Sequence, residues 1–475
     1  MGSRASGRWA AGLGLVWIFF AAACIPALPG GRARAPNASV PARYGAQDEA
    51  PSSAQVRWSE FFTDARLRAL IEAALKNNQE LNIVALEVDI ARNEIMARRG
   101  EYLPRVGVGL GAGIEKVGLY TSKGASDEAN GVEQHLPSFA FGFTASWEVD
   151  IWSKLRSATK AASLRYLASQ EGRSFAVTRL VGEIASAYYE LVALDSQLDV
   201  LKQNIEIQAS ALQVVRLQKE AAKVTELAVK RFEAEVLKNQ SRQYAIQQQI
   251  VETENRINFL VGRPPQRVER SAQRAAELVP PIVHAGVPSQ LLENRPDVRQ
   301  AQLELAAADL DFRVAKARFY PTLGISATLG YQSFDLLKLV STPASLAYGL
   351  GADLVAPLLN RTAITAGYFT ANAKQMQAVL QYERAILSGY LEVIKLLALL
   401  HNFEMSYDLQ AQQVERLARS IEISSQLFAS ARADYMEVLL TRRDALEAQM
   451  ELIENKRRQM SAAVGLYQAL GGGWR

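Results

Sequence analysis

The chain has little of the residue types that build disulfide, metal and catalytic sites. Its 475 residues include one cysteine, Cys24, and three histidines, His135, His284 and His401, which lie far apart in the sequence. One cysteine cannot form a disulfide framework, and the histidines lack the spacing of a metal site or a catalytic triad. No glycine-rich phosphate loop or nucleophile elbow accompanies them. We therefore predict that the chain is not an enzyme and holds no metal or other cofactor.

Long apolar runs and a strong charge of one sign are also missing. No run of eighteen apolar residues follows the N-terminal leader, which excludes a bundle of transmembrane helices and leaves β-strands for crossing a bilayer. The net charge is only +4, and basic residues alternate with acidic ones. This pattern is typical of solvated helix faces rather than of a nucleic-acid-binding surface, so no nucleic-acid partner is predicted.

The N-terminus has the parts of a secretory leader. Basic Arg4 and Arg8 precede an apolar stretch over 9–23, and Cys24 follows directly. The small residues before Cys24 resemble a bacterial lipobox, in which the cysteine receives diacylglycerol. We predict a signal peptide over 1–23, a lipidated Cys24 and a poorly ordered tether over 24–56, rich in Pro, Ala, Gly and Ser. The alternative is a signal peptide that is cut elsewhere. By resemblance to sorted lipoproteins, Ile25 after the cysteine indicates the outer membrane.

Four segments alternate apolar residues with small or polar ones. A period of two predicts strands with two different faces, and their length suits tilted membrane-spanning strands. Single-chain barrels begin at about eight strands, so several chains must share one barrel. The strands are expected at about 105–115, 138–150, 322–332 and 345–356.

The chain contains one unit twice. The segments 96–104 and 315–321 match each other, and placing Pro104 on Pro321 keeps the following strands in phase. A long helical pattern with few glycines or prolines follows each pair of strands, which predicts packed coiled coils. We predict a first repeat over 57–262, a linker over 263–288 and a second repeat over 289–475. The helices are expected at about 154–220, 225–260, 361–431 and 435–470.

Motifs along the mature chain resemble one known family. Trp58-x-x-Phe61-Phe62, Leu291-Leu292-x-x-Arg295-Pro296-Asp297 and the ending Leu470-Gly471-Gly472-Gly473-Trp474 carry the resemblance. The sequence is similar to the TolC-like outer-membrane factors, in particular the lipoprotein branch of tripartite (RND-type) efflux systems. The resemblance implies a mainly α fold with a membrane β component: a homotrimeric 12-stranded β-barrel, with four strands per chain, continued by a long α-helical coiled-coil barrel. It also implies three partners, which are a periplasmic adaptor (membrane fusion) protein, an inner-membrane pump and outer-membrane lipid.

Residues that line a duct are the candidate sites in the strands. The inward phase holds glycines that either keep the barrel lumen open or permit strand curvature; they are Gly107, Gly109, Gly111, Gly324 and Gly330. Aromatic residues either form girdles where lipid meets water or pack in a core; they are Trp147, Trp152, Tyr331 and Tyr348.

The two helix-to-helix turns correspond under the repeat, and the resemblance implies that this end is a periplasmic gate. Glu226, Arg432 and Asp434 are the gate candidates. Helix capping is the alternative role, since Thr225 and Asp434 are good N-cap residues. Ala433, where family members often carry acidic residues, argues against a strongly acidic ring.

We interpret the chain as a passive outer-membrane exit duct of a tripartite efflux pump, which exports small molecules across the periplasm and the outer membrane. The resemblance leaves the cargo open among drugs, metal ions, siderophores and solvents. A duct for type I protein secretion is the alternative within the fold. A trimeric surface adhesin and a structural envelope lipoprotein are alternatives from other classes.

Overall fold

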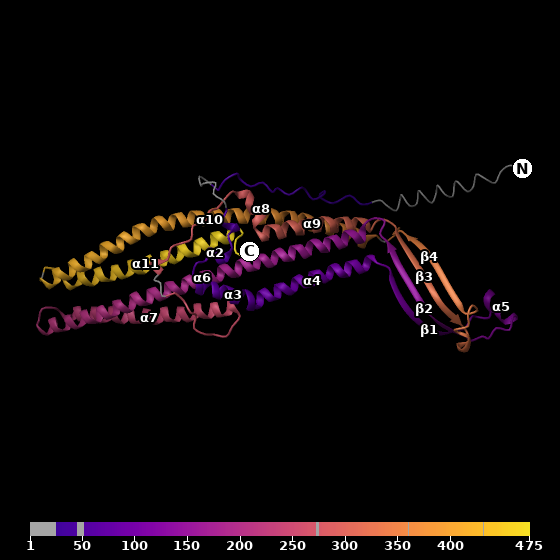
Figure 1. The fold of residues 1–475 in the computed structure, drawn as a ribbon, viewed down its shortest axis with the longest axis horizontal. Coiled ribbons are helices and arrows are strands. Elements are labelled where there is room, and N and C mark those ends of the chain that lie inside the picture. Colours follow the sequence, from indigo (N-terminus) through magenta and orange to yellow (C-terminus); the bar gives the residue numbers. More distant parts are fainter. Residues whose placement is uncertain (1–24, 45–51, 272–274, 360, 431) are drawn as a thin grey trace. The chain divides into compact units, whose positions relative to one another are not determined.

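The computed structural model describes residues 25–44, 52–271, 275–359, 361–430 and 432–475 (Figure 1). The predicted signal peptide and Cys24 lie outside the described residues, as does 45–51 of the tether. Two compact units divide the chain. The sheet unit comprises the described parts of 1–36, 89–168 and 302–381, and the helical unit those of 37–88, 169–301 and 382–475. Each unit therefore takes segments from both predicted repeats.

The sheet unit contains one four-stranded antiparallel sheet among the described residues. Its strand order is β1-β2-β3-β4, so that two hairpins from distant parts of the sequence join at β2 and β3. Prolines at 104 and 321 end the preceding helical segments, because proline cannot continue a helix and favours extended backbone before it. The strands are β1 (Arg105–Glu115), β2 (Leu136–Val149), β3 (Thr322–Ser333) and β4 (Leu346–Val355).

Long helices make up most of the remaining structure. The longest, α6 and α10, contribute residues to both units. The principal helices are α3 (Ala65–Asn77), α4 (Gln79–Tyr102), α6 (Lys154–Glu220), α7 (Glu226–Val261), α9 (Pro296–Ala317), α10 (Thr362–Ala429) and α11 (Tyr435–Ala469). Short helical elements are η1 (Ser53–Gln55), α2 (Trp58–Phe61), α5 (Ser122–Ala129), η2 (Ala275–Glu277), η3 (Pro288–Gln290), α8 (Leu291–Asn294) and η4 (Leu336–Lys338).

The core of the helical unit is built on an apolar stripe of α6. Side chains on this stripe recur every three or four residues and are less than a tenth exposed; they include Ile184, Ala187, Tyr188, Leu191, Leu194, Leu198 and Leu201. At the C-terminal end of α11, Tyr467 stacks on Phe61 with ring centroids 4.0 Å apart. The Tyr467 hydroxyl donates to the Val56 carbonyl at 2.5 Å. The helical period of the sequence thus corresponds to a buried face.

The contacts of Arg295 show the structural role of the motif that begins at Leu291. Arg295 is 5% exposed, and its guanidinium donates to Asp297, to Glu392 of α10 at 2.8 Å and to the Ala469 carbonyl of α11 at 2.7 Å. Burial opposes its charge, yet the two carboxylates raise the pKa of Arg295 above its ordinary value. Gly471, with φ of +95°, lets the chain turn close to the Asn294 carbonyl. The motif is a structural junction of three helices.

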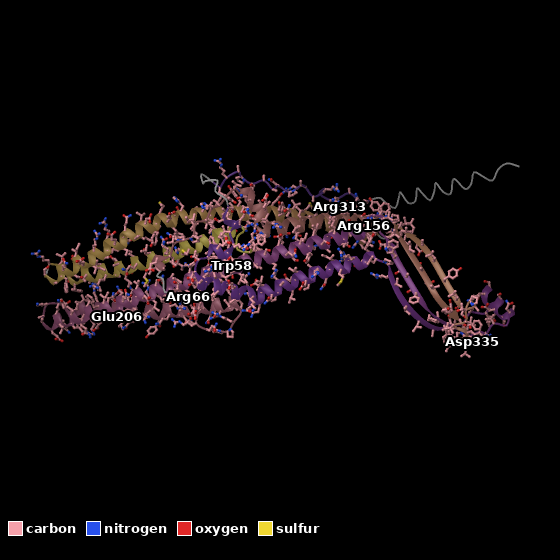
Figure 2. All side chains as sticks on the ribbon, viewed as in Figure 1. Trp58, Arg66, Arg156, Glu206, Arg313 and Asp335 are labelled. Carbon is pink, nitrogen blue, oxygen red and sulfur yellow. The ribbon has the colours of Figure 1, made fainter. Side chains whose placement is uncertain are left out.

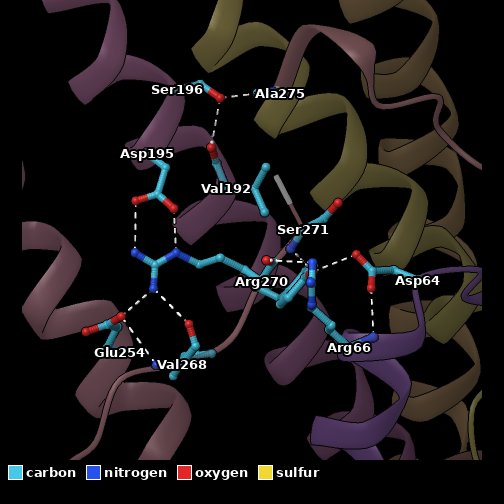
Figure 3. A network of polar contacts seen from close by, with 11 residues as sticks. Asp64, Arg66, Val192, Asp195, Ser196, Glu254, Val268, Arg270, Ser271 and Ala275 are labelled. Atoms are coloured by element: carbon cyan, nitrogen blue, oxygen red, sulfur yellow. Dashed lines mark hydrogen bonds and ion pairs between the residues drawn. The ribbon is translucent and has the colours of Figure 1, made fainter. Parts of the chain in front are cut away.

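A second polar network fixes the predicted linker to the helical unit (Figure 3). Arg270 forms ion pairs with Asp195 of α6 and Glu254 of α7, and its backbone carbonyl accepts from Arg66 at 2.8 Å. Nearby, Ser196 accepts a hydrogen bond from Ala275 N–H at 2.9 Å. Hydrogen bonds to charged groups are among the stronger ones, so this linker is a packed part of the fold.

The N-terminal segment differs from the expected poorly ordered tether. Ile25 and Leu28 pack on an aromatic cluster of the sheet unit. In this cluster Phe312 stacks on Tyr368 with ring centroids 5.1 Å apart. The Gly31 carbonyl accepts a hydrogen bond from Asn372 at 3.0 Å. Isolated apolar residues in a Pro- and Gly-rich stretch have no period, so sequence patterns do not show this docking.

One helix of the described residues has the length and composition to cross a membrane. It is α10, and only 17% of its most apolar window is buried. A single such helix is weak support for a helical span. Its exposed apolar residues include Leu380, Leu387, Leu391 and Leu409.

Candidate duct wall and helix tips

The strand register gives the sheet two chemically different faces. Residues directly opposite each other in an antiparallel ladder point to the same side. Val108, Phe143, Leu329 and Tyr348 form one such row across all four strands. The side that this row defines, the apolar face, carries no charged side chain over its whole length. A face of this kind is suited to lipid contact.

The opposite side, the small-residue face, holds mostly glycine, alanine, serine and threonine. All five glycines predicted to line a lumen lie on it: Gly107, Gly109, Gly111, Gly324 and Gly330. Its charged residues occur only at the ends, with Glu115 toward the loops and Arg105, Glu148 and Asp353 toward the helices. Between these ends, the side chains of the small-residue face are small and uncharged.

The glycines of this face fall into two groups. Gly330 lies directly opposite Gly142, and a Cβ atom at Gly330 would lie 2.6 Å from the Gly142 Cα. A side chain there would force β2 and β3 apart. A Cβ at Gly109 would have nothing within 4 Å, and one at Gly324 would reach its first neighbour only at 3.8 Å. Gly330 thus permits the close approach of two strands, a role that the sequence does not predict, whereas the space beside Gly109 is open.

Two of the predicted girdle aromatics lie at the helix-side end of the sheet. The Trp147 indole N–H donates to the Tyr102 carbonyl at 3.0 Å. The Trp152 indole N–H donates to the Pro321 carbonyl at 2.7 Å, and its ring stacks on Tyr320 at 4.8 Å. Each ring thus has an apolar body and a satisfied polar edge, as interfacial aromatics require.

The other two girdle aromatics lie toward the loop-side end. Tyr331 stacks on Phe141 with centroids 5.3 Å apart, and Tyr348 is 82% exposed on the apolar face. Trp147 pairs with Ile325 on β3, and six residues from there to Tyr331 span about 20 Å at the usual rise of a strand. Along strands tilted by about 40°, the two aromatic levels are therefore about 15 Å apart in depth, which is less than the roughly 25 Å height of a lipid-facing band.

Both outer edges of the described sheet are open. β1 and β4 are the terminal strands, and every residue of each is exposed. Long exposed edges with an apolar face are covered in folded proteins, because unpaired backbone groups template further strand pairing. The sheet is therefore part of a larger one.

At the first helix tip, Glu226 is held by two lysines. It forms an ion pair with Lys219 at the end of α6 and lies 3.8 Å from Lys230 one turn along α7. The hydrogen bond from Lys219 holds the pKa of Glu226 below its ordinary value. This first gate candidate thus ties α6 to α7, and sequence spacing does not reveal its partner Lys219 across the turn.

At the second tip, Arg432 and Asp434 are exposed. Neither side chain has a hydrogen bond or ion pair with another residue in the described part of the chain. Asp434 and Thr225 occupy the N-cap positions of α11 and α7, yet neither side chain accepts a hydrogen bond from its helix. The side-chain capping that was the alternative role is therefore not formed, and the Arg432 and Asp434 charges are available to another molecule.

Sequence reasoning missed Tyr320 and Phe141 as partners of the girdle. Tyr320 lies just before Pro321, outside the alternating run, and Phe141 is one of many apolar residues in its strand. A search for aromatic residues at paired positions of the two hairpins would find Phe141, which pairs with Tyr331. The contact of Trp152 with Tyr320 depends on backbone turns and leaves no sequence signal.

A two-faced sheet with open edges, continued by long packed helices, is the build of a chain that shares a membrane channel. The profile of the outer membrane efflux protein family matches residues 70–263 and 287–472. The chain belongs to this family. It is an outer-membrane efflux duct, as the sequence predicts, and its family and fold are those of outer-membrane channels rather than enzymes.

Individual relatives agree with this assignment. The chain is 30% identical over 444 residues to the pyoverdine export outer membrane protein OpmQ of Pseudomonas putida, covering 92% of this chain and 93% of OpmQ. It is 24% identical to the probable outer membrane lipoprotein SilC of Salmonella typhimurium, covering 97% and 98%. The open state of the Neisseria gonorrhoeae MtrE outer membrane channel has a similar fold, with a TM-score of 0.83, 21% identity and coverage of 95% and 99%.

Proposed function

We propose that three copies of the chain form a passive, non-catalytic exit duct of a tripartite efflux system. The two-faced sheet with open edges carries this proposal. Three sheets would make one twelve-stranded barrel, with the apolar face toward lipid and the small-residue face toward the lumen. The aromatic levels at Trp147 and Tyr331 would then lie toward the two opposite lipid–water boundaries. The relative named for pyoverdine export supports a small-molecule cargo.

The internal duplication suggests how neighbouring copies pair. Within the chain, Arg105 pairs with Ser146 and Thr322 with Val355, so β1 corresponds to β3 and β2 to β4. The β2–β3 junction places Phe143 opposite Leu329. The equivalent junction between copies, β4 with β1 of the next chain, places Ala352 opposite Ala112. Both residues lie on the apolar face, as closure of a barrel requires.

A disulfide tests this pairing. The variant with Ala112→Cys and Ala352→Cys should give a covalent trimer on oxidation, because opposite residues of a ladder lie within disulfide reach. A matched control replaces Ala112→Cys by Gly113→Cys, which points to the other face. Denaturing gels without reductant give the readout. Monomers alone from the first variant, or equal cross-linking in the control, would contradict the proposed barrel.

The membrane anchor is the lipid on Cys24. The similarity to a probable outer membrane lipoprotein supports it, and the docked segment from Ile25 to Gly31 would hold the anchored end on the sheet unit. Cells grown with radioactive palmitate should label the wild-type protein and leave Cys24→Ser unlabelled. Continued labelling of Cys24→Ser would refute the anchor.

The helix tips form the gate and meet the periplasmic adaptor and the inner-membrane pump. Arg432 and Asp434, whose charges are unpaired among the described residues, would form inter-chain contacts around the threefold axis together with Glu226. The exposed apolar residues of α10 would pack against a neighbouring copy.

Purified trimers in planar bilayers test the duct itself. The wild-type protein should show a small resting conductance that rises when tip charges are removed. Stable trimers that carry no current, even with Glu226, Arg432 and Asp434 all substituted, would overturn the duct.

A further inference from the structure

Two cavities in the sheet unit lie next to each other and share Val314 and Arg318. The first, of about 650 Å³, is bounded by the ends of α4, α6 and α9 and by the helix-side ends of the four strands. The second, of about 450 Å³, is bounded by α6, α9 and α10. Their common residue Arg318 lies just beyond the C-terminal end of α9. We call these two adjacent cavities together the passage; the first of them reaches the small-residue face.

Most charged side chains of this passage are neutralised within the chain. Lys154 pairs with Glu148, and Arg165 pairs with Asp311 and lies 3.8 Å from Glu304. Arg98 pairs with Glu94 and with Glu101 at 3.2 Å. These pairs hold three cations against five carboxylates, so the cations among them are already fully paired.

Four charged residues of the passage have no such partner. Arg105 and Asp353 line the first cavity, Lys374 lines the second, and Arg318 lines both. None of the four has a side-chain hydrogen bond or ion pair with another of the described residues. Three cations therefore face one carboxylate, and Ser146 and Ser326 add hydroxyl donors at the wall of the first cavity.

We propose that this passage binds organic anions, with Arg318 as the central contact and Arg105 and Lys374 on either side. These three cations have no ion-pair partner among the described residues, so each can take an anionic group as its partner. The planar guanidinium suits carboxylate and sulfonate groups because it donates two parallel hydrogen bonds. The inference rests on the proposed duct: anionic cargo would be held at the entrance to the uncharged small-residue wall.

A fluorescent trisulfonate, pyranine, is a suitable probe. Full-length protein in nanodiscs of zwitterionic lipid is titrated with pyranine at low salt, and anisotropy reports binding. We expect saturable binding that weakens as salt rises. Arg318→Gln should weaken it at least about tenfold, since one charge-assisted hydrogen bond is worth that factor in affinity. Arg318→Lys should retain most of the affinity.

Arg313→Gln is the matched control (Figure 2). Arg313 lies five residues before Arg318, pairs with Asp309 at 2.8 Å and lines neither cavity. Pyranine affinity that is unchanged in Arg318→Gln, or equally reduced in Arg313→Gln, would overturn the anion site.

Planar-bilayer conductance of the same preparations separates the two proposals. Current without pyranine binding refutes the anion site and leaves the duct standing. Pyranine binding without current, even when Glu226, Arg432 and Asp434 are all substituted, refutes the duct and leaves a surface anion site standing.

Discussion

Replacing Gly330 by alanine should weaken the junction of the two hairpins. The new methyl group would lie 2.6 Å from the Gly142 Cα and closer still to the Phe141 carbonyl. Both neighbours are backbone atoms of β2, so the strands themselves must separate. Inserting a methyl group into a packed site costs about 1–3 kcal/mol, and we expect the upper part of this range because no flexible side chain can yield. The trimer carries the change three times.

Gly109→Ala is the matched variant on the same face. Nothing lies within 4 Å of its Cβ, and alanine loses less backbone entropy than glycine by about 0.5–1 kcal/mol. Temperature-dependent dissociation of the trimer on mild-detergent gels should therefore occur lower than wild type for Gly330→Ala and at or above it for Gly109→Ala. Equal effects of the two variants would show that the division of glycines into packing and open positions is wrong.

Three further variants test the helical unit. Arg295→Ala should lower its free energy of unfolding by about 2–3 kcal/mol, below the full cost of breaking a buried pair because Glu392 is half exposed; denaturant titration measures this, and a change under 0.5 kcal/mol would contradict the junction. Glu226 has a lowered pKa, so its stabilising contact with Lys219 is present above the ordinary pKa of glutamate and is lost as pH falls through the lowered value. Hydrogen exchange at the tip should accordingly be faster in Glu226→Gln than in wild type at neutral pH and equal in strong acid. Asp434→Ala should raise the resting conductance, and an unchanged closed-state current would remove Asp434 from the gate.

The long helices and the strands of this fold can be predicted from the sequence, because buried residues recur with the period of a helix or of a strand. The buried stripe from Ile184 to Leu201 is visible as a helical period, and the four strands are visible as a period of two. A sheet with one apolar face shows its register in the same way, since a slip by one residue would reverse the faces. The small helix α5 (Ser122–Ala129) has no such pattern, and the sequence does not predict it. Thr121 caps this helix by accepting a hydrogen bond from the Gly124 N–H at 3.1 Å.

Contacts that join distant segments could not be read from the sequence. The docking of Ile25 depends on the aromatic cluster that contains Phe312 and Tyr368, and no local pattern of the tether predicts it. The same holds for Arg270, whose partners Asp195 and Glu254 come from two helices. The sequence pattern indicates which face of a strand a candidate residue occupies. The residues that contact it are visible only in the folded chain.

Cysteine accessibility in the assembled duct tests the central claim that the small-residue face lines the lumen. Gly109→Cys and Leu110→Cys are adjacent on β1 and point to opposite faces. Each variant is placed in a planar bilayer and treated with a charged, membrane-impermeant methanethiosulfonate. The account predicts that the current through Gly109→Cys falls in steps while that through Leu110→Cys is unchanged. A current that falls for Leu110→Cys and not for Gly109→Cys would contradict it.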